Sequence, residues 1–154
     1  MSEAILDYKV DRSGWPSGPW DSEPDRVDFV CAELACFVLR HPRHGCWCAY
    51  VGVPKEHPCY GKEPFAVPAE IHMGLNYGGV CNGLICHIPE PGMPADVWWL
   101  GADFGHAFDL CPGVDAREFA MGVLPVRCGI ETYRTLTYVR KQTEQLAKQL
   151  AAMR

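Results

Sequence analysis

The sequence predicts a single α+β domain over residues 1–154, with an antiparallel or mixed sheet of about five or six strands, long loops and one long C-terminal helix. Three observations support this fold class. Short runs of β-branched and aromatic residues recur between residues 27 and 101. Glycines and prolines, 15 and 13 in number, separate many of these runs and favour turns and loops. An amphipathic segment without Gly or Pro occupies residues 131–153.

The chain begins with a polar arm that leads into the first strands. Residues 1–26 are expected to form an extended N-terminal arm, because glycines and prolines break any regular element there. Two tryptophans in this arm, Trp15 and Trp20, either pin it to the rest of the protein or close over a ligand. Residues 27–53 have the pattern of two or three antiparallel strands in a meander. A helix over residues 27–40 is the competing prediction.

The middle of the chain alternates loops with short strands. Four prolines and one glycine in residues 54–69 predict a long ordered loop, and such loops in compact domains are often functional. Beyond it we expect short strands at residues 70–73, 83–88 and 97–101. A glycine-rich turn is expected at residues 74–79, where the backbone can approach a ligand closely.

The segment at residues 131–153 is predicted to be the C-terminal helix. Its apolar residues recur in alternating steps of three and four, as on one face of an α-helix. This face either packs on the sheet of the same chain or mediates a homo-oligomer. It consists of Leu136, Val139, Thr143, Leu146, Leu150 and Met153.

Composition excludes some classes of function. The 14 Lys and Arg residues against 19 Asp and Glu give a net charge of −5, so we expect no broad nucleic-acid surface. No apolar run approaches the roughly 20 residues that span a bilayer, and no secretory signal is visible, so we expect a cytoplasmic protein without membrane association. Its nine cysteines are then expected to be reduced. One basic cluster could bind a small anion: Arg40, His41, Arg43, His44, Lys55 and Lys62.

The pattern D-x-x-H-x-x-D at Asp103, His106 and Asp109 is the main candidate for chemistry. On a helix, steps of three place these side chains within about 120° of one another, and a loop after a strand can also bring them together. Carboxylate and imidazole donors suit Zn²⁺, Mn²⁺ or Fe²⁺. The alternatives are acid–base chemistry without metal, with His106 held in one tautomer by a carboxylate, and a purely structural role for an N-cap aspartate and a half-buried histidine.

Two further histidines, His72 and His87, lie in apolar runs next to turns rich in Gly or Pro. Since a buried imidazole needs a partner, one shared site would satisfy His72, His87 and His106 together. Separate structural roles are the alternative. We predict a hydrolytic divalent-metal site with His72, His87, Asp103 and His106 as ligands, and with Asp109 and His106 as the catalytic residues.

Aromatic residues provide candidates for binding a small molecule such as a nucleotide. Trp98 and Trp99 point to opposite faces if residues 97–101 form a strand, so one fills the core and its neighbour is free to stack on a ring. Core filling is the default interpretation. The candidate ligand-binding residues are His57, Tyr77, Trp99 and Arg40.

The cysteine spacings offer a weaker hypothesis. Cys46-x-Cys48 and Cys81-x4-Cys86-His87 are candidates for structural zinc, but neither has the paired two-residue spacing of zinc knuckles. Their interpretation as small buried apolar residues is therefore favoured.

Several motifs are distributed along the chain: Trp20-Asp21-Ser22-Glu23-Pro24-Asp25, Gly52-Val53-Pro54 with His57-Pro58 and Gly61, His72-x-Gly74-Leu75, Ile85-Cys86-His87-Ile88-Pro89, Trp98-Trp99-x-Gly101-x-Asp103 with His106 and Asp109, and Tyr133-Arg134. Together they resemble a family of small bacteriophage and prophage proteins that has no established activity. This resemblance implies a phage accessory protein in the bacterial cytoplasm, with a role in host takeover or counter-defence. The His and Asp residues described above, and not the resemblance, favour metal-dependent hydrolysis as the activity; the alternatives are a non-catalytic oligomeric protein that sequesters a host nucleotide signal and a direct inhibitor of a host enzyme.

Overall fold

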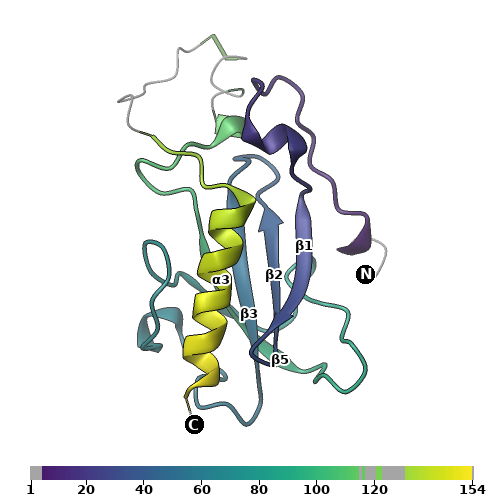
Figure 1. The fold of residues 1–154 in the computed structure, drawn as a ribbon, viewed down its shortest axis with the longest axis vertical. Helices are drawn as coiled ribbons and strands as arrows, with labels where there is room; N and C mark the ends of the chain where they lie inside the picture. The colour runs from purple at the N-terminus through teal and green to yellow at the C-terminus, as the bar shows by residue number, and fades with distance from the viewer. Residues whose placement is uncertain (1–4, 115, 117–120, 123–130, 154) are drawn as a thin grey trace.

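A computed structural model describes residues 5–114, 116, 121–122 and 131–153. In this part of the chain it confirms the α+β fold, with a five-stranded antiparallel sheet and a C-terminal helix (Figure 1). The strand order across the sheet is β1-β2-β3-β5-β4. The elements are η1 (Pro19–Ser22), β1 (Arg26–Cys31), β2 (Leu34–Arg40), β3 (Trp47–Pro54), η2 (Pro64–Ala66), β4 (Tyr77–Gly79), β5 (Val97–Asp103) and α3 (Leu136–Ala151).

The first three strands form the predicted meander. A two-residue turn joins β1 to β2, and both of its residues, Ala32 and Glu33, have positive φ values of 52° and 66°. Two successive positive φ values are typical of the tight turns that match the twist of antiparallel strands. Every residue of β2 is buried, because both faces of this central strand are covered. The competing prediction of a helix over residues 27–40 is wrong.

The second half of the sheet differs in part from the expected strands. The strand at residues 97–101 is confirmed as β5 and extends to Asp103. The strands expected at residues 70–73 and 83–88 are wrong: the first segment ends in a turn, and the second contributes only the isolated bridge between Asn82 and Ile85. The glycine-rich segment instead supplies β4, which pairs with β5 at the sheet edge. Residues 54–69 form the predicted loop, interrupted by the short η2.

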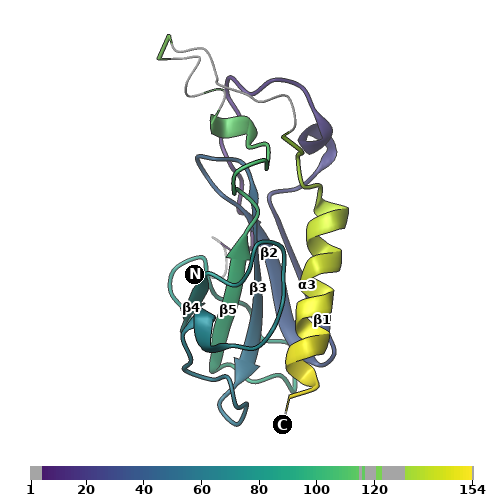
Figure 2. The ribbon, with the colours of Figure 1, turned by 90° about the vertical axis from the view of Figure 1, so that its left-hand side faces the viewer.

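The sheet has an apolar layer on each face. Helix α3 lies along one face, as Figure 2 shows, and buries Val139, Leu146 and Leu150 against the strands. This arrangement shows the apolar face of the helix packed on the sheet of its own chain. Thr135 caps the helix start, because its side chain accepts a hydrogen bond from the Tyr138 N–H.

The opposite face of the sheet carries the aromatic cluster of Phe37, Tyr50 and Trp99. The Phe37 ring stacks on Tyr50 with centroids 4.8 Å apart and meets Trp99 edge-on at 4.9 Å. The segment from residue 81 to residue 93 covers this cluster with Leu84, Met93 and other apolar side chains. Trp98 points to the helix side and Trp99 to this side, as the strand alternation predicts.

A buried arginine joins the N-terminal arm to the sheet and the helix. The Arg40 side chain is fully buried, and its guanidinium donates to Asp25, the Gly45 carbonyl, Tyr133, Glu23 and the Pro24 carbonyl. In the arm, Trp20 is buried edge-on against the Tyr133 ring, with centroids 5.0 Å apart. The arm is therefore pinned to the body through Trp20 and the arginine network.

No helix in the described ranges is long and apolar enough to cross a membrane. The expectation that all cysteines are reduced is wrong for one pair, because Cys81 and Cys86 form a disulfide. Six described cysteines, on β1, β2, β3 and the loops, are free thiols.

We predict that Arg40→Met destabilises the fold strongly. The change leaves the Glu23 and Asp25 carboxylates, 11% and 6% exposed, without their shared guanidinium. Breaking a buried ion pair from one side costs about 3–5 kcal/mol of unfolding free energy. Urea denaturation at neutral pH measures this loss of unfolding free energy. The control is Lys55→Met, which removes an exposed ion pair with Asp96 and is expected to leave the urea midpoint nearly unchanged. Equal midpoints for both variants would contradict the prediction.

Candidate metal centre

The candidate centre lies where β5 ends, beside the first turn of α3. After Asp103 the chain makes a turn in which the Asp109 N–H donates to the His106 carbonyl at 2.9 Å. The His106 N–H in turn donates to Asp109 Oδ2 at 3.1 Å. The turn passes through Phe108, whose φ is 77°. The three-residue spacing therefore brings His106 and Asp109 together in a loop rather than on a helix.

The segment that precedes α3 closes this turn from the other side. The Thr132 N–H donates to the Phe108 carbonyl at 2.8 Å, and the Thr132 carbonyl accepts from the Leu110 N–H at 2.9 Å. Two residues later, Arg134 Nε donates to Asp109 Oδ1 at 3.0 Å. The Asp109 side chain is only 3% exposed, so this charge-assisted bond offsets part of the cost of burying a carboxylate.

His72 reaches the centre from the loop that docks on α3. Its backbone N–H donates to Gln142 Oε1 at 3.0 Å, and Gln149 exchanges two side-chain hydrogen bonds with the backbone of Glu70. The His72 ring lies parallel to the Phe104 ring, with centroids 5.0 Å apart. In this position its Nε2 is 2.9 Å from Asp109 Oδ2.

The ring nitrogens of His72 have separate partners. Because a carboxylate only accepts, Nε2 carries the hydrogen that bonds to Asp109, and Nδ1 accepts from the Tyr138 hydroxyl at 3.0 Å. Tyr138 also meets the ring edge-on, with centroids 5.6 Å apart. Packing and hydrogen bonds together therefore fix the orientation of this imidazole.

His106 has one nitrogen without a partner. Its Nδ1 is buried, lies 3.9 Å from Asp109 Oδ2, and finds no hydrogen-bond partner among the residues that the structure describes. Its Nε2 faces Asp103 Oδ1 at 3.7 Å. Since an unpaired buried nitrogen is costly, this atom points to a missing partner inside the cluster. One donor atom each from His72, His106 and Asp109 lie within 4.8 Å of one another.

Only part of the predicted ligand set is brought together. His72, His106 and Asp109 converge, whereas Asp103 lies at the opposite nitrogen of the His106 ring and accepts hydrogen bonds from the Asn76 amide and the Gly105 N–H. His87 is on the other face of the sheet, where its ring meets Trp99 edge-on at 5.0 Å. The prediction that His87 joins His72 and His106 in one site is therefore wrong.

Most of the residues predicted to bind a small molecule are buried or make contacts within the protein. Trp99 and Arg40 are fully buried, so neither ring nor guanidinium faces solvent. His57 donates from Nε2 to the Leu150 carbonyl at 2.7 Å and accepts the Cys59 N–H at Nδ1, which ties its loop to the end of α3. Tyr77 packs edge-on against Tyr50, and burial raises the pKa of its hydroxyl above the ordinary value.

The cysteines next to the centre are not activated thiolates. A hydrogen bond with Cys46, together with burial, raises the pKa of the Cys111 thiol far above its usual value. Cys46 and Cys48 are buried at the start of β3, as their interpretation as small apolar residues predicts. The raised pKa keeps the Cys111 thiol protonated at neutral pH.

Three residues of the centre were absent from the predicted site: Arg134, Tyr138 and Gln142. Tyr138 and Gln142 are one helical turn apart on α3, on a polar face that the apolar periodicity does not mark. A search for polar residues on the helix face beside its apolar seam would have identified them.

Comparisons of the chain with protein-family models, with curated proteins and with solved structures find no match. The resemblance to a bacteriophage family stays a prediction, and the function proposed below rests on the geometry of the candidate centre.

We predict that Arg134→Met lowers stability through Asp109. The carboxylate remains buried but loses its charge-assisted hydrogen bond from the Arg134 guanidinium, which costs about 1–3 kcal/mol of unfolding free energy. The matched control is Arg140→Met on the same helix, whose ion pair with Glu144 is half exposed and contributes no more than about 1 kcal/mol. Urea denaturation of both variants measures the difference. An effect of Arg140→Met as large as that of Arg134→Met would refute the role given to Arg134.

Proposed function

We propose that the protein binds a divalent metal ion, Zn²⁺, Mn²⁺ or Fe²⁺, through His72, His106 and Asp109, and that it is a metal-dependent hydrolase. The Nδ1 of His106, which is buried and has no hydrogen-bond partner among the described residues, is the observation that carries this proposal. Two imidazoles and one carboxylate are a donor set used by catalytic zinc and iron sites that keep positions open for water or substrate.

The neighbours of the three ligands support the same assignment. Tyr138 is bonded to His72 Nδ1, and His72 Nε2 is directed at the centre. With metal at Nε2, the ring hydrogen would lie on Nδ1 and would donate to the Tyr138 hydroxyl oxygen. Asp103 faces His106 Nε2 and favours the tautomer whose lone pair is on Nδ1. Such outer partners orient metal-binding histidines in known sites. Arg134 holds one oxygen of Asp109 and leaves Oδ2 toward both imidazoles.

The residues around the centre suit hydrolysis of an anionic ester. A bound divalent ion lowers the pKa of a coordinated water and so supplies the nucleophile. Asp103, 36% exposed and oriented by Asn76, is the carboxylate beside the centre that can accept a proton from water. Arg134, 28% exposed, presents a cation to the negative group of a phosphoester or carboxylic ester. A substrate of the bacterial cell is part of this proposal, as the resemblance to phage accessory proteins implies.

We predict about one equivalent of Zn, Mn or Fe per chain in protein purified without chelator under non-reducing conditions. His106→Ala is expected to lose this metal, because it removes Nδ1 of the proposed ligand His106. The matched control is His57→Ala, another half-buried histidine bonded to α3, which should retain it. Elemental analysis by mass spectrometry gives the stoichiometry. Absence of stoichiometric metal, or equal contents in both variants, would sink the proposal.

We predict that Asp103→Asn retains the metal but hydrolyses esters more slowly, by about 10²-fold or more, because a general base is lost. Chromogenic phosphate and carboxylate esters provide the assay, and elemental analysis of the same sample confirms metal content. Asp96→Asn is the control, since this exposed carboxylate lies in the ion pair with Lys55. Equal turnover of metal-loaded Asp103→Asn and the parent protein would remove Asp103 from the mechanism.

A further inference from the structure

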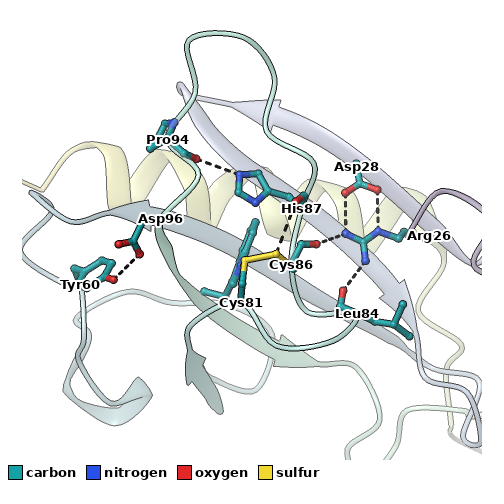
Figure 3. The surroundings of a disulfide bond; sticks show 10 residues. Arg26, Asp28, Tyr60, Cys81, Leu84, Cys86, His87, Pro94 and Asp96 are labelled. Carbon is teal, nitrogen blue, oxygen red and sulfur yellow. Dashed lines mark hydrogen bonds and ion pairs between the residues drawn. A yellow bond between two sulfur atoms is a disulfide. The ribbon is translucent and has the colours of Figure 1, made fainter. Parts of the chain in front are cut away.

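The Cys81–Cys86 disulfide closes a small turn on the sheet face opposite α3 (Figure 3). Between the two cysteines, Asn82 and Ile85 exchange two backbone hydrogen bonds of 3.0 Å. Gly83 within this turn has a positive φ of 57°, which a glycine adopts without strain. The backbone bonds do not involve sulfur, so they hold both cysteines in place when the disulfide is reduced.

Arg26 anchors the turn to the sheet. Its guanidinium donates to the Leu84 and Cys86 carbonyls, both at 2.6 Å, and to the Asp28 carboxylate (Figure 3). The same guanidinium lies 4.0 Å above the Phe37 ring. This side chain is 3% exposed, so the anchor is a desolvated and strong contact. The position of the turn therefore does not depend on the S–S bond.

One ring nitrogen of His87 lies within 4.8 Å of both sulfurs. Its Nε2 is 3.3 Å from the Pro94 carbonyl, which can only accept, so Nε2 carries the hydrogen and Nδ1 has the lone pair. That Nδ1 is buried and has no hydrogen-bond partner in the described part of the chain. Figure 3 shows the ring beside the disulfide. A backbone carbonyl on the far nitrogen is the usual partner of a metal-binding histidine.

The Trp99 indole is a second group that can stabilise negative charge on the Cys81 sulfur. The buried indole of Trp99 donates from Nε1 to Cys81 Sγ at 3.4 Å. An N–H donor at this position stabilises a thiolate once the S–S bond is broken. Donor atoms of Cys81, Cys86 and His87 all lie within 4.8 Å of one another.

We propose that reduction of the Cys81–Cys86 disulfide creates a metal site that binds Zn²⁺ through Cys81, Cys86 and His87. A cellular dithiol supplies two electrons and two protons, is itself oxidised to its disulfide, and leaves two cysteine thiols. Zinc binding then releases both thiol protons and forms two Zn–S bonds and one bond to His87 Nδ1, with water in the fourth position.

The chemistry of the donor set selects the metal. Two thiolates and an imidazole prefer Zn²⁺ to hard cations such as Mg²⁺ or Ca²⁺. Two Zn–S bonds of about 2.3 Å at a tetrahedral angle separate the sulfurs by about 3.8 Å. The Cα atoms of the two cysteines are 4.6 Å apart, so side-chain rotation alone can open this distance. The site is independent of the His72 centre, which lies on the other face of the sheet.

The test compares oxidised and phosphine-reduced samples of the full chain, both stripped of metal with a chelator. We expect the reduced form to bind about one more Zn²⁺ per chain than the oxidised form. With Co²⁺ as probe, only the reduced form should develop thiolate-to-cobalt charge-transfer absorption in the near ultraviolet. Equal metal binding by both forms, or no charge-transfer band after reduction, would overturn the proposal.

Variants locate the ligands. Cys81→Ser and Cys86→Ser should abolish the cobalt band, and His87→Ala, which keeps the disulfide, should weaken Co²⁺ affinity on the order of tenfold or more. Cys31→Ser is the matched control, because this half-buried thiol on β1 bonds to the Glu144 carbonyl of α3. A band that persists in the Cys81→Ser/Cys86→Ser double variant refutes the site. His106→Ala should keep the band, so failure of one centre is distinguishable from failure of the other.

Discussion

The buried guanidinium of Arg40 is the interaction on which the rest of the structure depends. Its five N–H groups all have acceptors, and these come from the N-terminal arm, the turn before β3 and the segment that precedes α3. Glu23 extends the network, because its second oxygen accepts the Leu136 N–H at the start of the helix. The segment fixed in this way carries Arg134 to Asp109. The geometry of the candidate metal centre therefore rests on a buried ion pair whose arginine lies 32 residues before His72, the nearest of the three ligands in sequence.

The sequence pattern predicted the strands whose side chains are buried in the core. It failed for segments whose structure is determined by backbone hydrogen bonds to a neighbouring strand. β1, β2 and β3 have β-branched and aromatic residues that suit a pleated surface, and α3 has an unbroken apolar seam. Residues 83–88 are equally apolar, yet Leu84 and Ile85 cover the aromatic cluster rather than extend the sheet. β4 has little apolar content, and it forms because the edge of β5 offers unpaired backbone groups.

The site was predictable to the extent that its residues are close in sequence. The turn from His106 to Asp109 follows from the three-residue spacing, because Asp109 accepts the His106 N–H and closes the turn. His72 is distant in sequence and is placed by Phe104 and Gln142, which no local pattern reveals. His87 looked equivalent to His72 in its surroundings, but it packs on Trp99, on the other side of the sheet. The disulfide was missed because spacing alone does not pair nine cysteines.

The contacts of β5 make both proposed centres depend on one hydrogen-bond register. Trp99 serves the cysteine turn on one face, and Phe104, whose N–H continues the ladder to the Trp47 carbonyl, supports His72 on the other. A slip of β5 by one residue against β3 would exchange the two faces of β5. The Trp99 ring would then turn away from His87, and the Phe104 ring from His72. Five strands and a helix could still assemble in such a slipped form. A protein with native secondary-structure content and neither metal centre is therefore the misfolded state to expect.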